Sequence, residues 1–576
     1  MPIKPPVAKR TEHVEVRHGG RVADPYAWLR DDSREDPEVL AYLEAENAYT
    51  EAMMRPVESL RRRLYDEMVA RIKEDDSTVP VRKDDYFYYS RTERGKQYRI
   101  HCRRRGGLDA AEQVVLDENQ LAEGHDYLRV GAFAVSPDHR LLAFSTDFDG
   151  SERFTLRVKD LDSGRLLPDS IDETYYSVEW AGDSRTLFYT RIDRTHRPFR
   201  LFRHRLGQPA ADDRLVYEES DPAFYLGLRK TKDDRFLVLS LESAVTSEER
   251  FLDAGDADGL FRLIEPRRNR HEYAAEHWNG RFLILTNDDA VNFKLVETPV
   301  ETPSREHWRT MIDHRDEVKL DAIEVFRDRI AVLKRERGLR EIDVIDRLSA
   351  ETRRIEFSEP AYDVYFSGNA EFDTDTLRFE YESMTTPRST YDYEMPTGER
   401  TLLKRIEVLG GFDPERYVAE RLFADSVGGK QVPISLVYRK GALDDGPAPL
   451  LLYGYGAYGA TIDPGFSSAR VSLLDRGMVY AIANVRGGGA LGRPWYEDGK
   501  LLAKRNTFDD FIAAAEQLIG RGYTASDRLA IAGGSAGGLL VGAALNMRPE
   551  LFRAAVAKVP FVDVVNTMLD PTIPLT

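Results

Sequence analysis

The chain has 576 residues, of which 31% are charged and 42% hydrophobic, and its formal net charge is −17. This length predicts at least two domains, and the acidic excess argues against a nucleic acid partner and modestly favours cationic peptides. The sequence has no apolar run of about 18 residues that could span a membrane and no apolar signal core at its N-terminus. Its single cysteine, Cys102, permits no internal disulfide, so we expect a cytoplasmic protein.

Residues 1–72 carry helical patterns. Asp24 and Pro25 begin the first pattern, Leu40 and Leu43 continue it, and a second pattern includes Leu60. Apolar residues at this spacing, with acidic residues between them, predict amphipathic helices.

Residues 73–405 are nearly free of helical periodicity. Short alternating strands recur roughly every 45–50 residues, and a polar turn precedes most of them. This period, with four short strands in each unit, predicts a seven-bladed β-propeller; a pair of β-sandwiches is the alternative. The clearest strands are 86–90, 141–145, 186–190, 236–240, 282–286, 330–333 and 376–381.

Residues 406–576 contain longer, more apolar strands with helical stretches between them, which predicts a largely parallel α/β sheet. The strands are expected at 432–438, 449–453, 478–484 and 528–532. Thr507 looks like the N-cap of a helix with an acidic first turn, and Gly520 or Gly522 would close that helix.

Residues 533–537 read Gly-Gly-Ser-Ala-Gly and stand between an apolar strand and a helix without a breaker until Pro549. This is the sequence form of the nucleophile elbow of serine hydrolases, in which small residues allow a tight strand-to-helix turn that exposes the serine. Ser535 is therefore a candidate nucleophile. The alternative is the glycine-rich turn of a nucleotide-binding unit, but the phosphate-loop spacing is absent.

Two further glycine-rich segments follow predicted strands. Residues 453–456, Tyr-Gly-Tyr-Gly, lie where hydrolases place a second oxyanion donor, which can be a backbone amide or a tyrosine hydroxyl. The alternative is a turn whose aromatic residues only pack. In residues 486–489, Arg-Gly-Gly-Gly, the glycines would let the backbone bend closely beside the elbow.

The chain resembles the prolyl oligopeptidase family of serine peptidases. Asp510, Ala514 and Leu518, followed by residues 533–540, match the family's active-serine signature, and both glycine-rich segments are similar to family segments. The resemblance is closest to the branch that cleaves after Arg or Lys. Strings that carry it occur along nearly the whole chain, at 24–29, 71–74, 85–89, 95–98, 472–477, 495–500 and 559–565.

The resemblance implies a cytosolic peptidase of short basic peptides. It implies an N-terminal helical segment (1–72) packed on the catalytic domain, a seven-bladed propeller (73–405) that excludes folded proteins, and an α/β-hydrolase domain (406–576) that is C-terminally incomplete. It implies no cofactor, no metal, no membrane and no nucleic acid, and a monomer or homodimer.

The resemblance also implies the catalytic roles. Ser535 would attack the scissile carbonyl to form an acyl-enzyme, and the Tyr455 hydroxyl and the Ala536 amide would stabilise the oxyanion.

Substrate-binding positions follow from the same resemblance. Phe561 would stack on the basic P1 side chain, and Tyr458 is placed with the substrate-binding residues. Asp463 matches one of two acidic positions tied to the next subsite. The second of these positions is Gly465, which puts a preference for paired basic residues in doubt.

A base for Ser535 is missing from the sequence. All 11 histidines lie at or before His314, whereas the triad order of this fold is Ser, Asp, His. Asp563 and Asp570 follow Ser535 too soon to be the triad acid. We expect the family pattern to continue beyond Thr576 and the 576 residues alone to be inactive. Prolyl oligopeptidase or acylaminoacyl peptidase activity is one alternative function, and a non-catalytic propeller binding module is another.

Overall fold

The computed structural model describes residues 4–17 and 19–570. Thr576, beyond which we expect the family pattern to continue, lies outside these ranges. The chain divides into two compact units, Met1–Ile72 and Lys73–Thr576.

The first unit contains a small hairpin and two helices. The second predicted pattern lies in a helix, whereas the first helix begins at Pro37 and not at Asp24 as predicted. The Asp36 side chain accepts hydrogen bonds from the N–H groups of Glu38 (2.8 Å) and Val39 (3.4 Å), and Pro37 occupies the first helical position. Both features favour a helix start at this point. The elements are β1 (Val14–Arg17), β2 (Gly20–Ala23), α1 (Pro37–Met54) and α2 (Glu58–Ala70).

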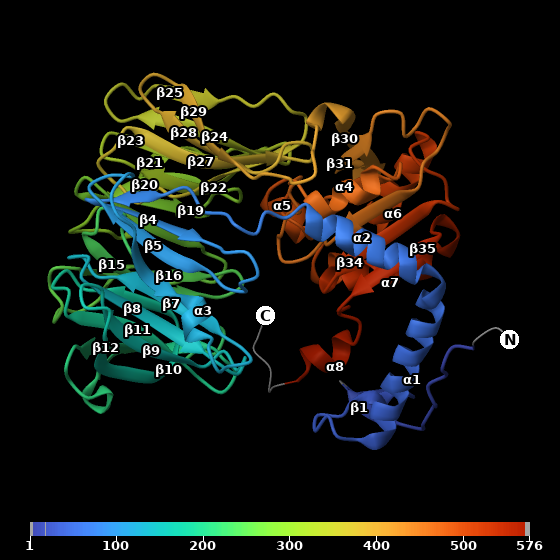
Figure 1. The fold of residues 1–576 in the computed structure, drawn as a ribbon, viewed down its shortest axis with the longest axis horizontal. Helices are drawn as coiled ribbons and strands as arrows, with labels where there is room; N and C mark the ends of the chain where they lie inside the picture. The colour runs from blue at the N-terminus through green and yellow to red at the C-terminus, as the bar shows by residue number, and fades with distance from the viewer. Residues whose placement is uncertain (1–3, 18, 571–576) are drawn as a thin grey trace. The chain divides into compact units, whose positions relative to one another are not determined.

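The second unit begins with a β-propeller, drawn in blue to yellow in Figure 1. Five of its sheets have four antiparallel strands in chain order, and a short helix, α3 (Glu118–Leu121), follows the first sheet. The strands predicted at 86–90, 236–240, 282–286, 330–333 and 376–381 are all confirmed. These sheets comprise β3 (Val81–Lys83), β4 (Tyr86–Arg91), β5 (Ile100–Arg105) and β6 (Gln113–Asp117); β14 (Tyr225–Lys230), β15 (Phe236–Glu242), β16 (Ser247–Asp253) and β17 (Arg262–Glu265); β18 (Tyr273–Trp278), β19 (Arg281–Thr286), β20 (Lys294–Pro299) and β21 (Arg309–Ile312); β22 (Val318–Val325), β23 (Arg329–Glu336), β24 (Leu339–Asp346) and β25 (Thr352–Ile355); and β26 (Tyr362–Phe366), β27 (Thr376–Ser383), β28 (Ser389–Glu394) and β29 (Glu399–Arg405).

The prediction of seven blades is wrong, because the propeller has five four-stranded blades and one continuous seven-stranded sheet. The physical reason is β10, a strand of 15 residues. Its first half pairs with β9, with Ser170 opposite Arg157, and its second half pairs with β11, with Val178 opposite Tyr189. The spacing of turn signals predicted a border between two blades in this region. In the structure β10 runs through this region as one strand. The sheet comprises β7 (Arg129–Val135), β8 (Leu141–Asp147), β9 (Phe154–Asp160), β10 (Leu166–Trp180), β11 (Thr186–Ile192), β12 (Pro198–Arg205) and β13 (Arg214–Glu218).

The C-terminal part of the second unit is an α/β domain, drawn in orange and red in Figure 1. Its six-stranded sheet has the order β30-β31-β33-β32-β34-β35, and the pairs β33–β32, β32–β34 and β34–β35 are parallel. The expected largely parallel sheet is therefore confirmed. Its elements are β30 (Tyr417–Ser426), β31 (Lys430–Arg439), β32 (Leu450–Gly454), α4 (Ser468–Leu474), β33 (Val479–Ala483), α5 (Arg493–Glu497), α6 (Arg505–Gly520), β34 (Leu529–Gly534), α7 (Ala536–Met547), β35 (Ala554–Lys558) and α8 (Val564–Met568).

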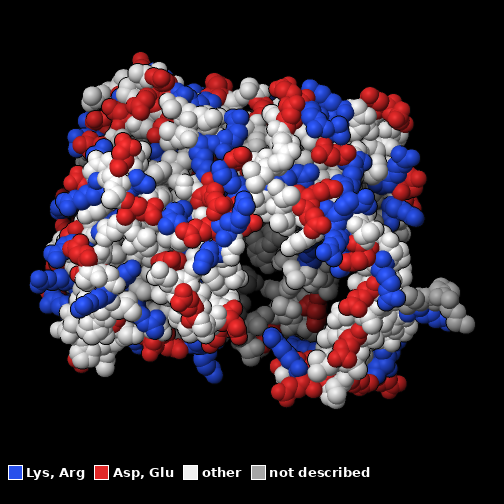
Figure 2. Space-filling model, viewed as in Figure 1, with Lys and Arg blue, Asp and Glu red and all other residues white. Residues whose placement is uncertain are grey.

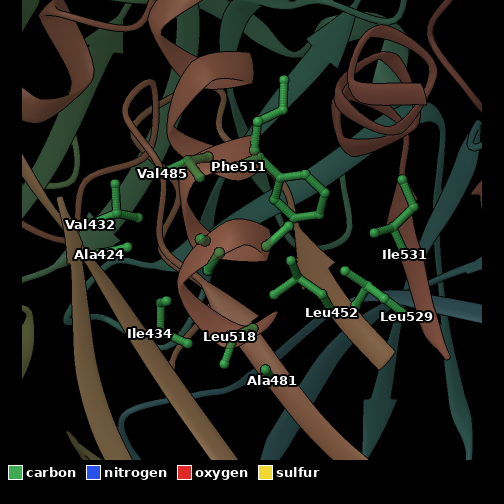
Figure 3. Close-up of a cluster of buried hydrophobic side chains, with 14 of the residues drawn as sticks. Ala424, Val432, Ile434, Leu452, Ala481, Val485, Phe511, Leu518, Leu529 and Ile531 are labelled. Atoms are coloured by element: carbon green, nitrogen blue, oxygen red, sulfur yellow. The ribbon is translucent and has the colours of Figure 1, made fainter. Parts of the chain in front are cut away.

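Helix α6 packs its apolar side chains onto this sheet. Figure 3 shows Phe511 and Leu518 beside strand residues such as Leu452, and all three are fully buried. The helix begins at Arg505, two residues before the predicted N-cap, so that prediction is wrong. The Thr507 hydroxyl donates instead to the Gly499 carbonyl, at 3.1 Å, and the helix ends at Gly520 as expected.

Charge is spread over the visible face of the molecule. Figure 2 shows lysine and arginine interspersed with aspartate and glutamate, so the acidic excess does not gather in one patch on this face. Among the described residues, no helix combines the length and the apolar character needed to cross a membrane.

Candidate functional site

Ser535 lies at the turn between β34 and α7 and has a strained backbone. Its φ of 54° and ψ of −120° lie outside the conformations that side chains favour, and the residue is exposed. Hydrogen bonds hold the turn: the Ser535 amide donates to the Lys558 carbonyl at 2.9 Å, and the Ser535 carbonyl accepts from the amides of Gly538 (2.8 Å) and Phe561 (3.0 Å). A strained, exposed serine at this turn is the geometry of a nucleophile elbow.

The small residues on either side of Ser535 are required by close backbone contacts. A Cβ on Gly533 would lie 2.3 Å from the Gly537 carbonyl oxygen, and a Cβ on Gly537 would lie 2.6 Å from the Gly454 carbonyl oxygen. Any larger residue would force these backbones apart. Close backbone contacts therefore require small residues at these two positions, as the sequence pattern predicts.

The segment after β32 lies directly against the elbow. The Tyr455 Cα lies 3.3 Å, and its Cδ2 3.5 Å, from the position that a Cβ on Gly537 would occupy. Ala536, which directly follows the serine, is the first residue of α7 and is buried. The structure thus brings Tyr455, Ser535 and Ala536 together from two different strand ends.

The three glycines of residues 487–489 pack backbone to backbone against that same segment. A Cβ on Gly487 would lie 2.2 Å from the Gly456 oxygen, one on Gly488 would lie 2.6 Å from the Ala460 oxygen, and one on Gly489 would lie 2.3 Å from the Gly459 oxygen. The Gly459 amide also donates to the Gly487 carbonyl at 3.0 Å. Residues 487–489 therefore form a floor under the loop that carries Tyr455.

A buried ion pair anchors this floor. The Arg486 side chain donates to the Asp510 carboxylate through Nε at 2.8 Å and through a terminal nitrogen at 2.5 Å, and the Arg486 amide donates at 2.9 Å. The side chains are 4% and 0% exposed, and the Ser426 hydroxyl donates a further bond at 2.5 Å. The hydrogen bonds to Asp510 raise the pKa of Arg486, so the guanidinium stays charged.

Two family descriptions match the sequence. "Prolyl oligopeptidase, N-terminal beta-propeller domain" matches residues 5–405, and "Prolyl oligopeptidase family" matches residues 464–576. The chain belongs to the prolyl oligopeptidase family. It is a serine peptidase of that family, as the strained Ser535 at the elbow indicates.

Individual relatives match nearly the whole chain of this family member. Dipeptidyl aminopeptidase BI of Pseudoxanthomonas mexicana is 47% identical, over 99% of this chain and 81% of the relative. Protease 2 of Moraxella lacunata is 42% identical, over 100% of this chain and 83% of the relative. The structure of oligopeptidase B from Leishmania major superimposes with a TM-score of 0.92 at 38% identity and covers 100% of this chain and 84% of that one.

Asp463 of this peptidase is engaged by the propeller. Arg335, whose side chain is 4% exposed, donates to both Asp463 oxygens at 2.6 and 3.1 Å. Arg340 lies 3.6 Å from Asp463 and donates to Asp363 at 3.3 Å, and Asp321 lies 3.5 Å from Arg335. These five residues form a charge cluster between the propeller and the α/β domain. Sequence reasoning missed the arginines because no local pattern marks a pairing across 128 residues.

The charge cluster makes stability depend on pH. Burial, followed by the nearby Asp463 carboxylate, raises the pKa of Asp363 to about 7. A folded-state pKa above the unfolded value of about 3.9 gives a contribution that is present below pH 4 and is lost as pH rises through about 7, with a slope of at most about 1.4 kcal/mol per pH unit. We expect Asp363→Asn to flatten this slope, measured by guanidinium unfolding between pH 5 and 8. Asp316→Asn, at a side chain that is 92% exposed, is the control, and an unchanged slope in Asp363→Asn would contradict this expectation.

Gly465 lies against a carboxylate from the propeller. A Cβ on Gly465 would lie 3.0 Å from Glu382 of β27, and the Glu382 carboxylate accepts the Phe466 amide at 3.0 Å. A side chain at position 465 would make a tight contact with the Glu382 carboxylate, which would have to shift slightly.

The other predicted substrate-binding residues lie on the two loops beside the serine. Phe561 is half-buried and is tied to the elbow through the bond from its amide to the Ser535 carbonyl. Tyr458 is 60% exposed, with a φ of 57°, on the loop that carries Tyr455.

The histidine rings bond elsewhere. His204 lies between Asp169 and Asp213, His277 bonds to Asp233, and both rings belong to the propeller. Within residues 4–17 and 19–570, no hydrogen bond joins the Ser535 hydroxyl to a histidine, and His18 lies outside these ranges.

Proposed function

We propose that this peptidase cleaves short peptides after Arg or Lys through an acyl-enzyme on Ser535. The observation that carries the proposal is the exposed, strained serine, with Tyr455 packed against Gly537 of the elbow and the Phe561 amide bonded to the Ser535 carbonyl. The Ser535 oxygen attacks the scissile carbonyl carbon, the C–N bond breaks, and the amine leaves with a proton. Water then hydrolyses the ester and frees the serine.

The neighbouring residues take specific roles in this proposal. The Tyr455 hydroxyl and the Ala536 amide donate to the oxyanion, where charge develops in the transition state. Phe561 stacks on the P1 cation, and Tyr458 contacts the peptide. Asp463 belongs to the next subsite, but the bidentate Arg335 neutralises its charge. We therefore propose that a second basic residue adds little to binding.

The proposal also covers the domain organisation, the compartment and the oligomeric state of the protein. We infer a helical segment (1–72), a propeller (73–405) and an α/β-hydrolase domain (406–576). We further propose that the protein is a monomer or homodimer. We also propose that it is cytoplasmic, which its single, buried cysteine, Cys102, supports.

A P1 scan tests the substrate class. Fluorogenic amides that carry Arg, Lys, Pro or acyl-Ala at P1 are compared as substrates of the protein. We expect kcat/KM to be highest for Arg and Lys, and Phe561→Ala to lower it more for Arg than for Ala. A preference for Pro would overturn the proposed specificity and leave the serine mechanism in place.

Tyr455→Phe tests the oxyanion role. The change removes one hydroxyl and keeps the ring, so we expect kcat to fall by about 10²–10³ while KM changes little. Tyr453→Phe is the matched control, because Tyr453 lies two residues earlier, within β32. Equal kcat values for the two variants would remove Tyr455 from the oxyanion site.

A further inference from the structure

Lys504 is a partly buried cation whose hydrogen-bond acceptor is a backbone carbonyl. Its Nζ donates to the Gly456 oxygen at 2.5 Å and lies 6.0 Å from the centre of the Phe508 ring. In the described part of the chain, no carboxylate lies within ion-pair distance of Lys504. Removing an ammonium from water without an anion is unfavourable, so this arrangement calls for a reason.

The Gly456 carbonyl is also in close contact with the Gly487 backbone. A Cβ on Gly487 would lie 2.2 Å from the Gly456 oxygen. Gly456 itself has a φ of +73°, and a Cβ there would lie 2.3 Å from the Thr507 side chain. The lysine and the glycine floor therefore clamp this carbonyl at the residue that directly follows Tyr455.

The charged groups around Lys504 do not compensate its charge. Burial alone lowers the pKa of Lys504 to about 8. The other charged and titratable groups of these segments pair with one another or belong to the loop itself: Lys500 with Glu497 (2.9 Å), Arg505 with Asp509 (3.6 Å), Arg486 with Asp510 (2.5 Å), and Tyr455 and Tyr458 on the loop.

We propose that Lys504 is a positioning residue for the oxyanion site: its ammonium fixes the Gly456 carbonyl and thereby holds Tyr455 against the nucleophile elbow. This inference rests on the oxyanion role proposed for Tyr455. A charged donor binds a carbonyl about twice as strongly as a neutral one. As pH rises through about 8, the ammonium loses its proton, the clamp weakens, and kcat declines.

Three variants test the clamp. Lys504→Met removes the donor, Lys504→Arg keeps a charge that does not titrate in this range, and Lys500→Met is the control on the same segment. We expect Lys504→Met to lower kcat by about 10- to 100-fold with KM nearly unchanged, because a small misplacement of a catalytic group is costly. We expect Lys504→Arg to lose the decline in kcat near pH 8. A kcat for Lys504→Met equal to that of Lys500→Met, or an unchanged decline in Lys504→Arg, would overturn the proposal.

Hydrogen exchange separates this inference from the proposed function. Backbone amides of residues 454–460 should exchange at least about 10-fold faster in Lys504→Met than in Lys500→Met, because the loop opens locally. Equal exchange rates would overturn the clamp even in a fully active peptidase. If the natural protein cleaves no Arg amide, the substrate proposal fails, and the exchange rates still decide whether Lys504 holds the loop.

Discussion

Ser535→Ala is expected to abolish labelling by a fluorophosphonate probe and to lower Arg-amide hydrolysis by the natural protein on the order of 10⁶-fold. The reason is that the Ser535 oxygen forms the covalent bond to substrate, and no neighbour can replace it from the same turn. The elbow places this one side chain in an exposed position while Gly533 and Gly537 pack tightly on either side. Ser526→Ala is the control, on the loop before β34, and should leave labelling intact.

The strain at Ser535 gives a second readout of the same site. Its φ of 54° and ψ of −120° cost about 1–3 kcal/mol for a residue with a Cβ. Ser535→Ala keeps the Cβ and should not change the free energy of unfolding, whereas Ser535→Gly should make the protein more stable by up to about that amount. Persistent labelling of Ser535→Ala would show that another residue reacts with the probe.

Asp510→Ala is expected to destabilise the α/β domain by about 3–5 kcal/mol, the cost of leaving a buried charge without its partner. Arg486 would keep its charge in a position where its side chain is 4% exposed, and the Ser426 hydroxyl would lose its acceptor. Trp495 is buried and lies 5.9 Å from the Arg486 guanidinium. Guanidinium unfolding followed by tryptophan fluorescence therefore reports on this region.

Two comparisons make the Asp510 prediction specific. Asp509→Ala, one residue earlier, breaks an exposed pair with Arg505, whose side chain is 77% exposed, and should cost less than about 1 kcal/mol. The double variant Arg486→Met with Asp510→Leu should recover part of the loss, since no unpaired charge remains buried. A loss no larger than that of Asp509→Ala would show that the pair contributes little.

Local patterns predicted much of the fold and of the elbow. The run of apolar residues before Ser535 and the small residues around it act within one strand and one turn, so the sequence displays them directly. The same holds for the short strands of the propeller, although the number of blades was wrong because nothing local shows that β10 continues from one group of strands to the next.

Contacts between distant segments could not be predicted in this way. The pairing of Asp463 with Arg335 and the bond from Lys504 to Gly456 join residues whose types are ordinary at their own positions. Only the folded chain brings them together. A helix start also depends on such contacts: Thr507 bonds to Gly499 across the loop, and the helix begins two residues earlier than its cap pattern indicates.

The long strand β10 also determines how the propeller can come apart. A four-stranded sheet can separate from its neighbours by giving up side-chain packing at its borders, while its own hydrogen bonds remain. Residues 129–218 have no such border within them, because β10 is paired with β9 and with β11 along one unbroken backbone. These residues should therefore unfold as a single cooperative unit. The propeller should separate first at the borders between the four-stranded sheets.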